Sequence, residues 1–179
     1  MSYKTDSEKA KLFYKENENK IKDLFVGDLY TLEFDNDKLG KLFDQLASTD
    51  LVLINEHKKV YGVAMRINFS EHMHDKVTIR YERHSNTKTE YEKTIESFKS
   101  KSFNSNYGIQ CNSQDNVLVK SICYDRLDLF RKIEINKKQI LNNYIKRAYE
   151  KDGIRYNTYL EFNFDFFKKN NIEHKIVIH

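Results

Sequence analysis

The strongest constraint on the fold is the alternation of apolar and polar side chains from Val60 to Phe69. The apolar set is Tyr61, Val63, Met65, Ile67 and Phe69, and the opposite set is Gly62, Ala64, Arg66 and Asn68. Successive side chains of a strand point to opposite faces, so this segment predicts a strand with one face on a core. Residues 77–82 and 160–166 alternate in the same way. The chain therefore contains a sheet with a buried side.

Helical patterns flank these strands. Apolar residues at helical spacing predict helices over about 6–25, 37–47 and 137–149, with Gly153 at the cap that follows the last. The sequence Thr89-x-x-Glu92 is a capping box, with Thr87-x-x-Glu90 as a second register, and it predicts a helix that starts there. Shorter apolar runs predict strands over 51–55, 107–112, 117–124 and 176–178.

This order of elements predicts a mixed α/β fold with one central mixed sheet of about five to six strands, flanked by helices. A length of 179 residues fits a single domain spanning 1–179. Within it we expect a helical part at 1–48, the sheet core at 49–124, and a helix with a strand at 125–179.

Charge is distributed unevenly along the chain. Residues 1–50 carry a net charge of −3, whereas residues 51–179 carry +7. The basic part is compatible with a polyanion partner, and equally with a solvated lysine-rich surface. We expect a cytoplasmic protein with reduced thiols, because the N-terminus is polar, the two cysteines cannot form a disulfide scaffold and no apolar run is long enough for a membrane span.

The most informative stretch is Thr49 to Asn68, TDLVLINEHKKVYGVAMRIN. Asp50 stands at the head of an apolar strand, a polar turn follows, and the next strand carries small and cationic residues on one face. Where two carboxylates stand with a cation in such a layout, they can hold Mg²⁺ against a phosphate.

This layout resembles the PD-(D/E)xK phosphodiesterase superfamily, over about residues 44–124. The resemblance implies a restriction-endonuclease-like core, with Asp50 as the first acid and Arg66 at the place of the lysine. Ala64 stands where the second carboxylate is expected, and it cannot bind metal. The segment VAMRINF…TIRYERHSNTKTEYEKTI further looks like uncharacterised phage and mobile-element proteins of this type.

Two explanations for Ala64 stay open, beside the simpler alternative that Asp50 only caps a turn, Arg66 is an ordinary strand cation and Glu90 only favours a helix N-terminus. In the first, the acid has migrated to Glu90, or less directly to Glu82 or Glu8, and Asp50 with Glu90 binds Mg²⁺ in an active nuclease. In the second, catalysis is lost and the fold is used for binding, which the alanine itself favours. Either way we expect Asp50 and Arg66 on adjacent strands, facing the same side of the sheet.

Further side chains are candidate site residues. Arg80, Arg83, Lys88 and Lys93 are candidate nucleic-acid contacts, because arginine and lysine bind phosphates. His57, His72 and His74 are metal-capable, but a polar loop explains His72 and His74 without a metal. Cys111 lies in an apolar strand, where we expect a small core residue rather than a nucleophile.

The sequence supports three functions. The first is a phage or mobile-element protein with a degenerate nuclease-like site that binds DNA or a nucleic-acid-processing complex, with an active Mg²⁺-dependent endonuclease as its catalytic form. The second is an inhibitor of a host defence complex, such as an anti-CRISPR, that binds protein. The third is a homo-oligomer that uses an exposed aromatic face of Phe162, Phe164 and Phe166.

Overall fold

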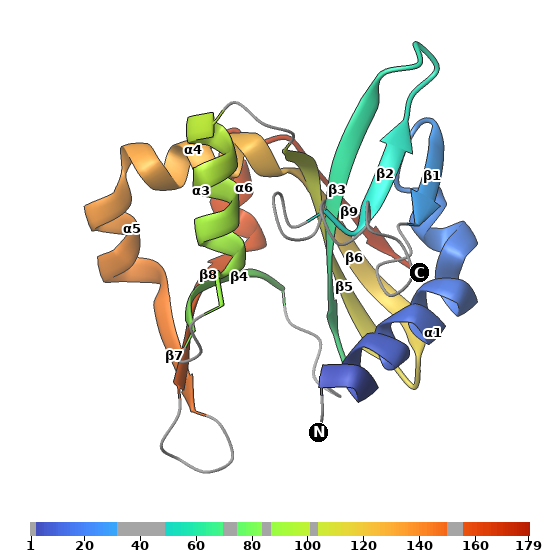
Figure 1. The fold of residues 1–179 in the computed structure, drawn as a ribbon, viewed down its shortest axis with the longest axis horizontal. Coiled ribbons are helices and arrows are strands. Elements are labelled where there is room, and N and C mark those ends of the chain that lie inside the picture. The colour runs from blue at the N-terminus through green and yellow to red at the C-terminus, as the bar shows by residue number, and fades with distance from the viewer. Residues whose placement is uncertain (1–2, 32–48, 70–74, 84–86, 101–103, 150–155) are drawn as a thin grey trace.

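The computed structural model describes residues 3–31, 49–69, 75–83, 87–100, 104–149 and 156–179 (Figure 1). The helices are α1 (Tyr3–Lys22), α3 (Glu90–Ser100), α4 (Arg126–Ile135), α5 (Lys137–Tyr144) and α6 (Phe164–Lys169). The strands are β1 (Asp28–Thr31), β2 (Leu51–Ile54), β3 (Val60–Asn68), β4 (Lys76–Arg83), β5 (Ser105–Gln114), β6 (Val117–Asp125), β7 (Ile145–Tyr149), β8 (Tyr156–Asn163) and β9 (His174–Ile178).

The mixed α/β class is confirmed, with a central sheet of six strands in the order β1-β2-β3-β5-β6-β9. This sheet is mixed because β3 and β5 are parallel while its other neighbouring strands are antiparallel. Helix α3 precedes β5 on the crossover from β3 that a parallel pair requires. In Figure 1 the sheet lies between α1 on one side and α3, α4, α5 and α6 on the other.

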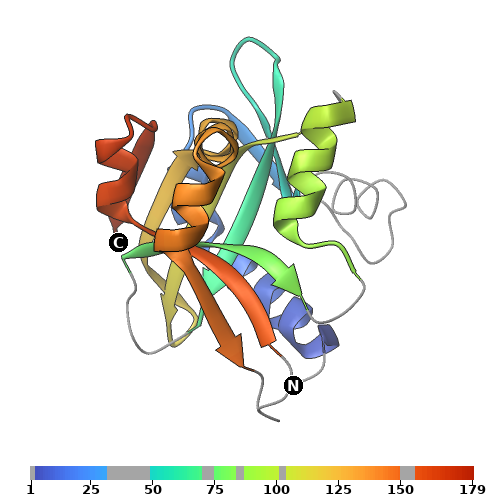
Figure 2. The same cartoon turned by 90° about the vertical axis from the view of Figure 1, so that its left-hand side faces the viewer.

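The expectation of one sheet was incomplete, because β4 leaves the central sheet and forms a second sheet of order β4-β8-β7. Figure 2 shows this second sheet in front of the central one. The alternation over 77–82 is present, but Val77 and Ile79 pack into a separate core beneath the helices. Periodicity reports that a strand has a buried face, not which sheet buries it.

The two faces of β3 have different partners, as the alternation predicts. Tyr61, Val63, Met65 and Ile67 pack into the core under α1. That core is formed by both helix and sheet residues and also contains Cys111 and Cys123. The opposite face of β3, with Ala64 and Arg66, turns toward the second sheet and α3, and the candidate site lies there.

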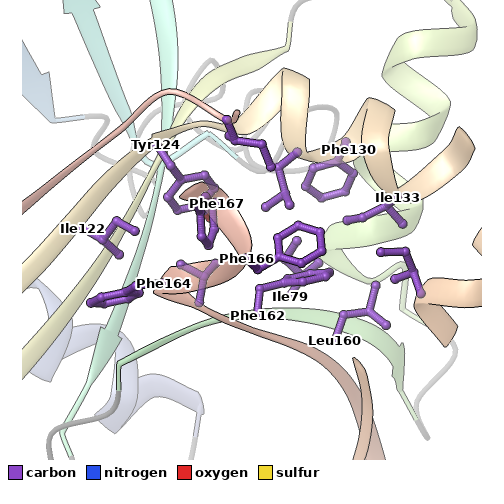
Figure 3. Packing of buried hydrophobic residues seen from close by; sticks show 14 of the residues in the cluster. Ile79, Ile122, Tyr124, Phe130, Ile133, Leu160, Phe162, Phe164, Phe166 and Phe167 are labelled. Carbon is purple, nitrogen blue, oxygen red and sulfur yellow. The ribbon is translucent and has the colours of Figure 1, made fainter. Parts of the chain in front are cut away.

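The second core is rich in aromatic side chains (Figure 3). Phe162, Phe164 and Phe166 are 0%, 9% and 5% exposed, and Phe162 and Phe166 pack against each other with ring centroids 4.6 Å apart. The expected exposed aromatic face is therefore wrong, and with it the sequence argument for a homo-oligomer disappears. Burial of these rings stabilises the join between the second sheet and the helices.

Several element boundaries differ from expectation near the C-terminal part. The predicted helix over 137–149 ends at Tyr144, and Ile145–Tyr149 instead pairs with β8. The predicted strand over 160–166 ends at Asn163, whose side chain caps α6 by accepting the Phe166 N–H at 3.0 Å. Helix α4 was not predicted. Its signals are the Asp125 cap, which accepts the Asp128 N–H, and three buried residues at helical spacing, Leu129, Phe130 and Ile133.

The predicted first helix corresponds to α1, and the last strand to β9. The predicted helix at 37–47, Gly153, His72 and His74 lie outside the described residues. Within the part of the chain that is described, none of the helices has the length and apolar character needed to cross a membrane.

Candidate functional site

A pocket of about 250 Å³ lies where β3, β4 and the start of α3 meet. Its lining comes from the residue that precedes β2, from β3, β5 and β6 of the central sheet, from β4, and from the start of α3 with the residues just before it. The lining residues are Asp50, Ala64, Met65, Arg66, Thr78, Arg80, Arg83, Lys88, Glu90, Lys93, Ile109 and Tyr124. All seven residues predicted as catalytic or nucleic-acid-binding are among them.

Asp50 is held at the rim of the central sheet by the backbone of β3. Its N–H donates to the Val63 carbonyl at 2.9 Å, and its Oδ2 accepts the Met65 N–H at 2.7 Å. Since Leu51 pairs with Val63, Asp50 continues the ladder opposite Ala64. Asp50 and Arg66 therefore lie on adjacent strands and line one pocket, as predicted.

The floor of the pocket is formed by a cross-strand row. Ala64 pairs with Gly108, and Gly108 pairs with Tyr124. A Cβ on Gly108 would lie 2.2 Å from Cζ of Tyr124, so the tyrosine ring lies across the glycine and extends toward β3. Figure 3 shows the ring beside Phe167. Burial, together with the nearby Glu90 carboxylate, raises the pKa of Tyr124, so its hydroxyl stays protonated.

Glu90 is the first residue of α3 and lies between two arginines. Its Oε1 accepts from Arg126 Nη2 at 3.2 Å, and its Oε2 accepts from Arg66 Nη1 at 3.4 Å. Arg126 has no exposed side-chain surface, and it also donates to Thr94 Oγ1 at 2.7 Å. Glu90 is thus the counter-charge of a buried arginine as well as a lining residue.

The capping box places Glu90 at the pocket. The Thr89 N–H donates to Glu92 Oε2 at 2.8 Å and the Glu92 N–H donates to Thr89 Oγ1, as the sequence predicts. Because Thr89 also bonds the Tyr81 carbonyl, the start of the helix is fixed to the end of β4.

Five cationic side chains line the pocket against two carboxylates. Arg66 and Arg80 both approach the ring of Tyr159, at 5.2 and 5.7 Å from its centroid. The N–H and the hydroxyl of Thr78 donate to Gln110 Oε1, and these bonds link β4 to β5 beside the two arginines. The basic lining attracts anions, and arginine favours phosphate because its planar donors can bind two oxygens.

The donor set fits a divalent cation poorly. Both oxygens of Glu90 already accept from arginines, Oδ2 of Asp50 accepts a backbone N–H, and the remaining charged lining is positive. No group of three or more histidine, cysteine or acidic residues able to hold a metal is found in the described ranges. Magnesium prefers oxygen ligands with room for several waters, which this environment opposes.

The other predicted groups lie away from the pocket. Glu82 accepts from Thr158 Oγ1 at 2.8 Å, and Glu8 belongs to α1 on the opposite side of the sheet. His57 is exposed in the turn before β3 and faces Glu56. Burial raises the pKa of Cys111 and of Cys123 to about 12, so both thiols are inert core groups, as predicted for Cys111.

Sequence reasoning missed Tyr124 and Arg126. Tyr124 ends the apolar strand predicted over 117–124, a pattern typical of a core residue, and Arg126 stands two residues later. The available signal is Gly108, since a glycine inside a strand indicates close approach by a neighbour. No protein-family model, curated protein or solved structure matches this chain.

Proposed function

We propose that this chain binds a nucleic acid through the phosphates of its backbone, at the pocket between β3, β4 and α3, and that it does not cleave its ligand. In this proposal the chain is a degenerate relative of PD-(D/E)xK phosphodiesterases, of the phage and mobile-element type. The observation that carries it is the convergence of Arg66, Arg80, Arg83, Lys88 and Lys93 on one pocket.

Charge favours an anionic ligand. The five cations come from β3, β4 and the residues around the start of α3, so separate parts of the chain supply one electropositive surface. The start of α3 adds the positive end of a helix dipole. Contacts of this kind position a nucleic acid without reading its sequence.

The carboxylates argue for binding rather than catalysis. Ala64 provides no ligand at the position where the resemblance expects an acid, and Glu90 is held by Arg66 and Arg126. In this proposal the described lining residues supply the cations of a phosphodiesterase site, while their two carboxylates are held by other groups and do not share a metal.

The test is equilibrium binding of fluorescent single-stranded and duplex oligonucleotides, followed by anisotropy at several salt concentrations. The double variant Arg66→Gln/Arg80→Gln should weaken binding by roughly a hundredfold or more, because each of the two charge-assisted bonds contributes about 1.5–3 kcal/mol. For a single strand the slope of log K against log salt should fall by about 1.4, since each lost phosphate contact removes roughly 0.7.

The matched control is Arg131→Gln/Lys138→Gln, which removes the same charge from exposed positions of α4 and α5. It should leave the affinity nearly unchanged. Equal weakening in both double variants would assign binding to overall charge and refute the pocket as the site. Absence of salt-sensitive binding to every oligonucleotide would refute the proposal itself.

One observation favours a second candidate, metal-dependent cleavage: Asp50 and Glu90 line the same pocket. Incubation of plasmid with the protein and Mg²⁺ or Mn²⁺ decides between the two. Cleavage that is lost in Asp50→Ala, and kept in the Arg131→Gln/Lys138→Gln control, would replace the binding function with the catalytic one.

A further inference from the structure

Any phosphate that enters the pocket competes with Glu90 for Arg66. The Arg66 guanidinium donates to Glu90 Oε2 at 3.4 Å, and both side chains are partly exposed, at 30% and 21%. Arg126 holds the other oxygen of Glu90 from a fully buried position. The carboxylate therefore stays in place while the exposed arginine is the group that a ligand can recruit.

This competition distinguishes two kinds of phosphate. An internal phosphodiester carries one negative charge, the same as the Glu90 carboxylate. Arg66 therefore gains no electrostatic attraction when it moves from the carboxylate to the phosphodiester. A phosphate monoester carries about −1.5 to −2 at pH 7 and offers three terminal oxygens. It can engage Arg66 and Arg80 together while Glu90 keeps Arg126.

The shape of the pocket points the same way. Ala64 and Tyr124, which form its floor, are 8% and 5% exposed, so the floor is recessed below the charged rim. A volume of about 250 Å³ is less than the roughly 300–1,000 Å³ of sites that enclose drug-sized ligands. A group that reaches this floor must be small and must project from its parent molecule, as a terminal phosphate does.

We propose that the ligand of this pocket is a phosphate monoester at the end of a nucleic-acid strand, bound by Arg66 and Arg80 in competition with Glu90. This inference rests on the proposed function and specifies its ligand. Internal phosphates of the same strand contact the rim cations Arg83, Lys88 and Lys93, whereas the terminal phosphate reaches the floor.

The experiment compares single strands of one sequence that differ at one end. One strand has a hydroxyl at both ends. The others carry either a phosphate or a methyl phosphate, placed at the 5′ end or at the 3′ end. A methyl phosphate keeps the terminal group but has one charge, so it isolates the second charge from the presence of an end. At one of the two ends, the strand with a phosphate should bind at least about tenfold more tightly than the strand with a methyl phosphate at that end. This difference corresponds to the gain of roughly one charge-assisted bond.

A competition arm separates the two sources of such a phosphate. A nucleoside monophosphate should displace the phosphorylated strand only at much higher concentration, because it lacks the internal phosphates that contact the rim. If the mononucleotide binds as tightly as the phosphorylated strand, the strand end is refuted as the ligand and a free nucleotide takes its place.

The Glu90→Gln variant tests the competition directly. With the carboxylate charge removed, the methyl phosphate strand should bind more tightly, and the preference for the monoester should shrink from about tenfold to a few-fold. Thermal unfolding checks that the variant is folded, and if it is not, the strand series on the natural protein decides alone.

Two negative results have different meanings. Equal, salt-sensitive binding of all three kinds of end would overturn this inference and leave the proposed function standing. No salt-sensitive binding to any strand would overturn the proposed function, and this inference with it.

Discussion

The guanidinium of Arg126 has no exposed surface and donates to the carboxylate of Glu90, with 3.2 Å between Nη2 and Oε1. Within the described residues, Nε and Nη1 of Arg126 have no hydrogen-bond partner, although the guanidinium lies 4.7 Å from the ring centroid of Phe130. Glu90 is consequently the group that makes a buried positive charge tolerable. The Glu90–Arg126 pair therefore stabilises the start of α3 in the absence of a ligand.

Replacing Glu90 by glutamine should destabilise the fold by about 3 kcal/mol, the lower end of what breaking a buried ion pair costs. The charge of Arg126 would then be buried without compensation. Urea unfolding measures the change. Glu96→Gln is the matched control on the same helix, since Glu96 is 54% exposed and pairs with exposed Lys88, and it should cost less than about 1 kcal/mol. Equal losses in the two variants would contradict the structural role of Glu90.

A second prediction concerns the floor of the pocket. Gly108→Ala should destabilise the protein by about 1–3 kcal/mol, because the new methyl group meets the Tyr124 ring. Adding Tyr124→Leu should make the alanine less costly than it is beside tyrosine. A double-mutant cycle measured by urea unfolding gives this coupling, and strict additivity of the two changes would show that the ring does not lie across residue 108.

The thiols provide a prediction on pH. Burial raises the pKa of Cys111 and Cys123 to about 12, so the fold favours the protonated thiols. Their stabilisation is complete below the ordinary thiol pKa of about 8.5 and is lost as the pH rises from there toward 12. At pH 8 the folded protein should react very slowly with a disulfide reagent, and both thiols should react at once in denaturant. A rapid reaction of the folded protein would contradict their burial.

The sequence predicted the mixed α/β class and residues that line one pocket, but not the arrangement of all the strands. Asp50, Arg66 and Glu90 could be placed together because an alternating strand fixes which side chains share a face, and a capping box fixes where a helix begins. The alternation did not predict that β4 joins β8 rather than the central sheet, because pairing depends on contacts between distant segments. The pattern of Phe162, Phe164 and Phe166 suggested one strand, whereas the local cap at Asn163 divides it between β8 and α6.

Tyr124 and Arg126 could not be assigned from their local sequence. Each acquires its role from a neighbour that is distant along the chain: Gly108 leaves space for the tyrosine ring, and Glu90 compensates the arginine. A single sequence shows the residue types but not these pairs. A single sequence reveals only those site residues whose position in a strand or helix determines the direction of the side chain.

The nucleic-acid affinity of Asp50→Asn, measured by anisotropy with EDTA and with Mg²⁺, decides whether the pocket binds phosphate or metal. Asparagine keeps an oxygen to accept the Met65 N–H, so the fold should persist while one negative charge leaves the pocket. If the pocket binds phosphate, the affinity should rise by roughly a few-fold and be independent of Mg²⁺, because a like charge no longer opposes the phosphate. Binding that requires Mg²⁺ in the natural protein and is lost in Asp50→Asn would contradict this expectation.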